Sequence, residues 1–168
     1  VMTTLGVTTL ISDSGVTRYR VNTEEWMMYD RKKPSYWAFE KGVYMEQFDS
    51  IFNVEASIKA DTAYYYDKER LWKLIGNVDI QNRKGERFNT ELLYWNEATQ
   101  KVYSDKFIRI QQPDRIITGH GFDSNQQMTI YTIRNIEGIF YVDEEASSGP
   151  PQPETKALPD SVNKDTAK

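Results

Sequence analysis

The stretch IKADTAY (residues 58–64) leads to LWKLIGNVDI (71–80), and a second such pair, FNTELLY (88–94) and KVYSDKFIRI (101–110), follows it. Each copy has the pattern of a short strand, a polar corner and another strand. A weaker third copy occurs near the start of the chain, at residues 19–26. Because repeated strand pairs stack on one another, these internal repeats predict an elongated β structure.

Residues 52–60 show the strand pattern most clearly, since apolar residues occupy the even positions and polar residues the odd ones. This period of two is typical of a strand with one face in water. Turn-forming residues at 82–86 and 96–100 predict hairpins, and the two glycines in 119–122 predict a bulge. Residues 128–134 and 139–142 are the last two predicted strands. The sequence therefore predicts an all-β, antiparallel fold.

The chain divides into a body and a tail. Residues 1–142 carry the strand patterns, whereas residues 143–168 hold four of the six prolines and few large apolar residues. Such a segment buries too little surface to offset the entropy lost on ordering. We predict one β domain over 1–142 and a disordered, Pro-rich acidic tail over 143–168.

The composition excludes several classes of protein. The net charge is −4, with 25 acidic and 21 basic residues, which argues against a nucleic-acid-binding protein. The absence of cysteine excludes disulfides, thiol catalysis and cysteine-based zinc sites. No apolar run approaches the roughly 20 residues that a membrane-spanning helix needs.

Catalytic chemistry has little support in the sequence. The only histidine, His120, lies between two glycines, and no partner base or nucleophile is evident. The segment Asp123-Ser124-Asn125 lacks the spaced acids and the central glycine of a calcium-binding loop. We therefore predict no enzymatic activity, no metal site and no cofactor.

Aromatic residues occupy both faces of two predicted strands, in Tyr64-Tyr65-Tyr66 and in Leu92-Leu93-Tyr94-Trp95. One explanation is a sandwich buried on both sides. The other is a half-open β structure whose apolar interior binds a lipid. Because apolar strand faces usually belong to a core, the residues by themselves favour the sandwich.

Four segments resemble the LptC family in their order and spacing: residues 58–63, 74–80, 89–92 and 99–105. The resemblance extends over residues 10–142. LptC is the inner-membrane-attached periplasmic component of the lipopolysaccharide export bridge. Its relatives LptA and the amino-terminal domain of LptD share much of this pattern, but residues 19–21 and the insertion around Pro34 look more like LptC.

The resemblance implies a twisted β-jelly roll of antiparallel strands, open along one seam. It implies a non-enzymatic protein that accepts lipopolysaccharide from an inner-membrane ABC transporter and passes it to an LptA-like bridge protein through an apolar trough. It also implies a periplasmic location, attached to the inner membrane through an N-terminal segment absent from this chain. Residues 1–9 would then be a flexible linker from that segment, and strand edges would allow a homodimer in vitro.

The alternation of apolar residues along each predicted strand indicates which side chains would line this trough and contact lipid: Phe52, Val54, Ala56, Ile58, Val78, Ile80, Ile108, Ile110, Met128 and Ile130. Three glycines at expected bends are predicted to be structural: Gly76, Gly119 and Gly121. The edge strand that would meet the LptA-like partner comprises Ile139, Phe140, Tyr141 and Val142, and residues 10–21 would face the transporter.

The competing hypothesis is a carbohydrate-binding or adhesive β-sandwich, in which exposed Tyr and Trp side chains stack on sugars. A closed core with a flat external aromatic platform would favour that function. An open seam lined by apolar side chains would favour lipid transfer.

Overall fold

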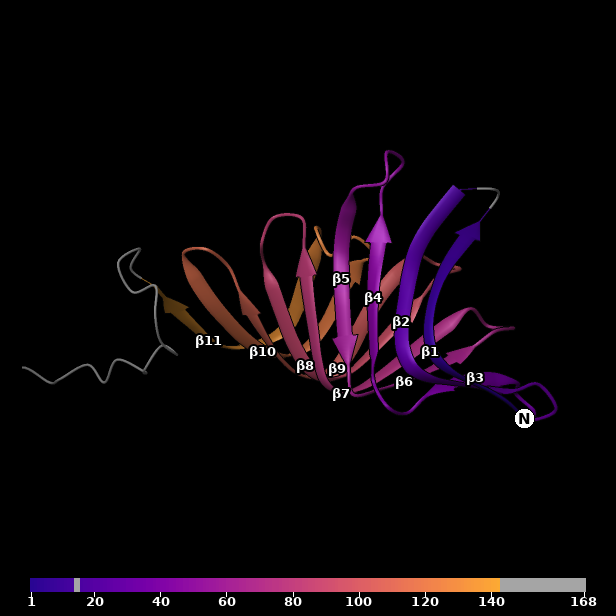
Figure 1. The fold of residues 1–168 in the computed structure, drawn as a ribbon. Coiled ribbons are helices and arrows are strands. Elements are labelled where there is room, and N and C mark those ends of the chain that lie inside the picture. The colour runs from indigo at the N-terminus through magenta and orange to yellow at the C-terminus, as the bar shows by residue number, and fades with distance from the viewer. Residues whose placement is uncertain (14–15, 143–168) are drawn as a thin grey trace, which may run out of the picture.

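The computed structural model describes residues 1–13 and 16–142 (Figure 1). These residues form eleven strands and no helix. The described part of the chain therefore contains no helix that could cross a membrane. The strands are β1 (Met2–Asp13), β2 (Val16–Tyr29), β3 (Tyr36–Phe39), β4 (Val43–Phe48), β5 (Val54–Ala60), β6 (Thr62–Tyr66), β7 (Leu71–Asn82), β8 (Arg87–Asn96), β9 (Lys101–Gln111), β10 (Arg115–Asn125) and β11 (Tyr131–Tyr141). All pairings are antiparallel and join one sheet, which confirms the predicted fold class. The predicted tail, 143–168, lies outside the described residues.

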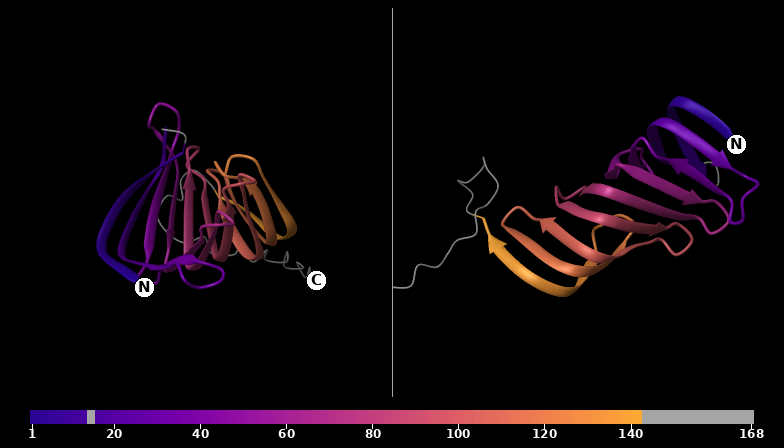
Figure 2. Two further views of the ribbon diagram at one scale, coloured as in Figure 1. Left: turned by 90° about the vertical axis from the view of Figure 1, so that its right-hand side faces the viewer. Right: turned by 90° about the horizontal axis from the view of Figure 1, so that it is seen from below.

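The sheet folds over on itself because its long strands bend near their middles. Residues 79–82 of β7 pair with β5, whereas residues 71–75 of the same strand pair with β6. Two walls result. Wall A contains residues 19–23, 43–48, 54–60, 78–82, 87–90, 107–111, 116–119 and 138–141, and wall B contains residues 27–29, 36–39, 62–66, 71–75, 92–96, 101–104, 122–125 and 131–133. The walls form an elongated roll with β1 at one end and β11 at the other (Figure 2).

Polar residues mark the line along which the strands bend. The Asp61 carboxylate accepts a hydrogen bond from Asn77 Nδ2 at 2.7 Å, and the Thr90 hydroxyl donates to the carbonyl of Phe107 at 2.8 Å. Thr23 likewise donates to the carbonyl of Gly42 at 2.8 Å, in the turn between β3 and β4. Such bonds satisfy backbone and side-chain groups where the regular ladder is interrupted. The polar corners of the sequence repeats therefore lie at the bends.

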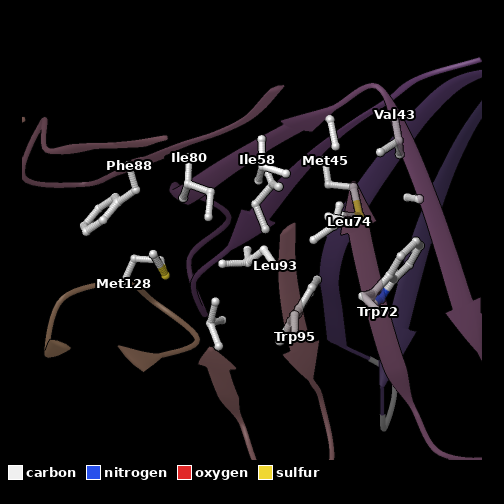
Figure 3. Close-up of a cluster of buried hydrophobic side chains, with 14 of the residues drawn as sticks. Val43, Met45, Ile58, Trp72, Leu74, Ile80, Phe88, Leu93, Trp95 and Met128 are labelled. Atoms are coloured by element: carbon white, nitrogen blue, oxygen red, sulfur yellow. The ribbon is translucent and has the colours of Figure 1, made fainter. Parts of the chain in front are cut away.

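The hydrophobic core fills the space between the two walls, and Figure 3 shows side chains of both walls pointing toward one another. Wall A contributes Val43, Met45, Ile58, Ile80 and Phe88, and wall B contributes Trp72, Leu74, Leu93 and Trp95. Burial of each large apolar side chain stabilises the fold by about 1.5–3 kcal/mol. The alternation within each strand thus places one face of each wall in this core.

The second aromatic face of wall B points outward. Tyr64, Lys73, Tyr94 and Tyr103 lie opposite one another on successive strands and are half-buried. The Tyr94 and Tyr103 rings stack with centroids 5.3 Å apart. The two-sided aromatic pattern is therefore explained by one inner and one outer face, and not by burial of both.

Residues 2–9 are part of β1, so the predicted flexible linker over 1–9 is wrong for these residues. The strand pairs with β2 from Met2 opposite Met28 onward. Val7 and Ile11 are partly buried against the core, and this apolar contact, together with the β2 ladder, orders the segment. The two strands predicted over 128–134 and 139–142 are instead one continuous strand, β11, that begins at Tyr131.

The three predicted structural glycines lie at irregular positions. Gly76 and Gly121 have positive φ angles of 81° and 86°, a region that favours glycine. Gly119 lies at a register shift of β10, where an added Cβ would be 2.5 Å from the carbonyl oxygen of Asn135 in β11. The bulge predicted at 119–122 is confirmed, and close approach of the β11 backbone requires glycine at 119.

Gly119→Ala is expected to lower the free energy of unfolding by about 2–4 kcal/mol, because the new methyl group would collide with backbone atoms of β11. Gly138→Ala is the matched control. Its Cβ would approach mainly the ring of Phe140, a side chain that can turn away, and the Thr118 hydroxyl. Urea denaturation of both variants measures the difference, and equal losses would contradict the assignment.

Candidate functional site

The seam of the roll lies opposite the bends, where the strand ends of wall A meet those of wall B. Toward β11 the seam is bridged, since Asn82 Nδ2 donates to the carbonyl of Met128 at 2.8 Å. Tyr131 donates to Glu86 at 2.5 Å and accepts from Gln112 at 2.5 Å. Burial and the Glu86 carboxylate raise the pKa of Tyr131 to about 12, so its hydroxyl remains a donor at neutral pH.

Nearer β1 the seam leaves a cleft of about 510 Å³, which we call the seam cleft. Its lining includes the aromatic side chains of Tyr19, Trp37, Tyr65 and Trp95. Three of these are buried members of the core and Trp37 packs against it, so these rings form the floor of the cleft. Residues 47–50, at the end of β4 and in the β4–β5 loop, line one side. The cleft therefore joins the outside of the roll to its apolar interior.

Glu97 lies in this cleft and connects the two walls. Its Oε1 accepts hydrogen bonds from Tyr19 Oη at 2.6 Å and from Trp72 Nε1 at 2.9 Å. Its Oε2 accepts from Tyr65 Oη at 3.3 Å and lies 3.7 Å from Arg70 Nε. Tyr19 belongs to wall A, whereas Tyr65 and Trp72 belong to wall B, so this carboxylate holds the seam together at the cleft.

The electrostatics of the cleft keep both tyrosines protonated. Burial, followed by the charge of Glu97, raises the pKa of Tyr65 to about 12 and raises that of Tyr19 well above its usual range. Both hydroxyls therefore donate to the carboxylate at neutral pH, as the network requires.

One donor on the cleft floor has no acceptor. Among the described residues, buried side-chain nitrogen atoms without a hydrogen-bond partner occur at Trp26 and Trp95. Trp95 lines the cleft, and an unpaired buried donor costs about 1–3 kcal/mol. The aromatic floor thus contains an unpaired indole N–H, that of Trp95, beside the hydrogen-bonded tyrosines.

Seven of the ten predicted lipid-lining residues are buried between the walls: Ala56, Ile58, Val78, Ile80, Ile108, Ile110 and Met128. Strand parity identified the inward direction of the six that lie within strands, whereas Met128 lies in the β10–β11 loop. They pack against side chains of the core, and their contact with lipid stays a prediction.

The inward position predicted for Phe52, Val54 and Ile130 is wrong, because these side chains are 55%, 46% and 76% exposed. Phe52 lies in the β4–β5 loop, and a register shift at the start of β5 displaces Val54 from the regular alternation. Ile130 precedes β11 and lies in a turn. Apolar parity holds only within a regular strand, and these residues lie at or beyond strand ends.

The sequence analysis did not include the aromatic side chains of the cleft floor among the residues predicted to line the trough. Tyr65 and Trp95 belong to the aromatic runs noted in the sequence, and inner parity with the buried Trp72 on the adjacent strand would have selected them. Tyr65 and Trp95 lie beside Tyr19 in the cleft, although Tyr19 is far from both of them in the chain. A local sequence pattern does not predict contacts between residues so far apart.

The predicted partner edge lies on β11, whose one strand partner within residues 1–13 and 16–142 is β10. Ile139 and Phe140 are 44% exposed and Tyr141 is 78% exposed. Val142 follows the end of the strand, and its N–H donates to the carbonyl of Asp114 at 2.9 Å. The three strand residues thus lie on an unpaired sheet edge.

The histidine of the chain, His120, is not among the residues that line the cleft. His120 is exposed on β10, and its Nδ1 lies 2.5 Å from a carboxylate oxygen of Glu137. Within the residues that the structure describes, no cluster of three or more His, Asp or Glu side chains is placed to hold a metal ion. The cleft offers apolar contact and hydrogen bonding.

Glu97→Ala is expected to lower the free energy of unfolding by about 3 kcal/mol, because Tyr19, Tyr65 and Trp72 would lose a buried acceptor. Glu97→Gln retains one oxygen for Tyr19 and Trp72 and should cost about 1 kcal/mol. Glu55→Ala, in the wall of the same cleft, is the control. Chemical denaturation measures all three, and a Glu97→Ala loss no larger than that of Glu55→Ala would show that the network adds no stability.

Comparison with known proteins identifies the family. The family model described as "Lipopolysaccharide-assembly, LptC-related" matches residues 7–141, and no curated protein matches the chain. Proteins of this family take part in lipopolysaccharide transport and are not known as enzymes. In general they are associated with the periplasm and the inner membrane. Since the match covers most of the chain and nearly all of its strands, the chain belongs to the LptC-related family of lipopolysaccharide-assembly proteins.

Proposed function

We propose that the protein accepts lipopolysaccharide from an inner-membrane ABC transporter and passes it to an LptA-like bridge protein, without catalysing a reaction. The observation that carries this proposal is the seam cleft, whose aromatic floor is continuous with the core. Acyl chains on this floor would gain about 0.8 kcal/mol for each buried methylene group. The body would lie in the periplasm and be attached to the inner membrane.

The proposed route runs from the cleft into the space between the walls, where the seven buried lining residues lie. Side chains now fill that space, so the walls must separate for acyl chains to enter. The bonds of Tyr19 to Glu97 and of Tyr131 to Glu86 cross the seam. Each such bond contributes about 1.5–3 kcal/mol, because its acceptor is a charged carboxylate. Opening at the seam would break these bonds and the apolar contacts between the walls, whereas at the bends the walls are joined by the backbone of the long strands.

The two end strands supply surfaces for assembly. Among the described residues, β1 pairs with β2 alone and β11 with β10 alone, so within this part of the chain each presents a row of backbone groups without strand partners. A strand from another protein can complete such an edge and extend both walls. We assign the β11 edge to the LptA-like protein and the β1 end to the transporter. The same edges would allow a homodimer in vitro.

The carbohydrate-binding alternative draws on the outer tyrosines of wall B. Their rings do not form one flat platform, since Tyr36 and Tyr64 meet edge to face at an interplanar angle of 76°. Tyr64 is also hydrogen-bonded to Glu40. The cleft with its aromatic floor gives better support to lipid transfer than this face gives to sugar binding.

A photo-crosslinking residue in place of Trp37 or Ile58 is expected to capture lipopolysaccharide, because both positions face the proposed route. The same residue at Lys59, which is exposed and neighbours Ile58, should capture little. Crosslinked lipid is detected by immunoblotting after ultraviolet irradiation. Capture at Lys59 alone would place the lipid on the outer face, and binding of soluble glycans without any capture would favour the carbohydrate hypothesis.

Ile139→Lys combined with Tyr141→Lys is expected to weaken end-to-end pairing with an LptA-like protein by about tenfold, because charges on a strand edge oppose strand addition. Both side chains are exposed, so the fold should persist. Leu5→Lys with Leu10→Lys, on the exposed side of β1, is the matched control and should leave this pairing unchanged. Sedimentation velocity of the mixture measures the complex. Equal weakening by both pairs would refute the assignment of β11.

A further inference from the structure

The β4–β5 loop, residues 49–53, carries an apolar tip. Figure 1 shows this loop extending beyond the turn that joins β7 and β8. Ile51 is 76% exposed and Phe52 is 55% exposed, and the neighbouring Val54 is 46% exposed. Large apolar side chains gathered at one exposed point are typical of a contact site.

Hydrogen bonds hold the loop in one conformation. Asp49 Oδ1 accepts from the backbone N–H groups of Ile51 at 3.0 Å and Asn53 at 2.8 Å. The backbone of Asp49 donates to the carbonyl of Asn53 at 2.9 Å and accepts from the N–H of Phe52 at 3.2 Å. These four bonds close the loop tightly, so the apolar tip is presented without a further ordering cost on binding.

Phe52 adopts a conformation that bulky residues rarely have. Its φ angle is 68°, in the region that favours glycine or asparagine. The ring stacks on Phe48, with centroids 4.4 Å apart and an interplanar angle of 6°. Phe48 also lines the seam cleft. The Phe52 ring therefore continues the apolar surface of the cleft outward, and Ile51 lies next to it.

We propose that Ile51 and Phe52 form an apolar contact for an acyl chain of the lipid held in the seam cleft. This inference rests on the proposed function and adds a lipid-binding position outside the space between the walls. Asp49 and Ser50 of the same loop line the cleft, so a chain that leaves the cleft on this side meets the tip next.

The size of the tip favours an acyl chain over a protein. A stable protein interface buries roughly 800 Å² on each partner, far more than two side chains provide. An acyl chain needs no hydrogen-bond partners and gains from each apolar group that it covers. The chemical class of the ligand is therefore an amphiphile with at least one chain long enough to reach past the cleft.

Crosslinking at single positions tests the contact in the full chain. A photo-crosslinking residue at Ile51 should capture lipopolysaccharide, and the same residue at Leu5, which is 70% exposed on β1 and outside the cleft, should not. Capture at Trp37 with none at Ile51 overturns this inference and leaves the proposed function standing. No capture at either position overturns both. Capture of protein alone at Ile51 makes the tip a protein contact and overturns the inference.

Binding measurements give a second test. Ile51→Ser and Phe52→Asn should each weaken binding of fluorescent lipopolysaccharide by about three- to tenfold, because each removes apolar contact area. Asparagine tolerates the positive φ angle, so the loop should keep its shape. Leu5→Ser should bind as the unchanged protein does. Affinities equal to that of the unchanged protein in both loop variants would refute the contact.

Discussion

The bend shared by the long strands is the constraint on which the structure depends. Each bend falls beside a polar residue, such as Asp61 with Asn77 or Thr90 with the carbonyl of Phe107, that satisfies groups left without ladder partners. Because the bends coincide from strand to strand, inner side chains of the two walls face one another and form one core. The seam, the cleft and the two free edges are what remains when a single sheet folds along such a line.

The seam combines two kinds of interaction that serve different needs. Apolar contacts between the walls supply most of the stability, and they have no directional requirement. The carboxylates of Glu97 and Glu86 fix which residues meet across the seam, since each accepts bonds from tyrosines of the opposite wall. Polar bonds thus set the register of the two walls, and aromatic rings form the floor of the cleft between them.

Much of the fold was predictable from the repeats, because strand alternation and polar corners are local properties of the chain. Ile58 and Ile108 were placed correctly, as both lie within regular strands. The prediction failed for Phe52 and Ile130, where strands end, and for residues 2–9, whose order depends on pairing with β2. The cleft was beyond such reasoning, since the bond from Tyr19 to Glu97 joins residues 78 positions apart.

The placement of the bends also decides how the roll deforms. On one side of the roll the long strands run from wall to wall as continuous backbone, whereas on the other side the walls meet only through side-chain bonds and apolar contacts. Its compliance is therefore directional: it is stiff along the strands and soft across the seam. Widening at the seam would need no change in the register between strands, so the outer edges of β1 and β11 would keep their geometry. A chain of such rolls can remain joined end to end while each of them opens in turn.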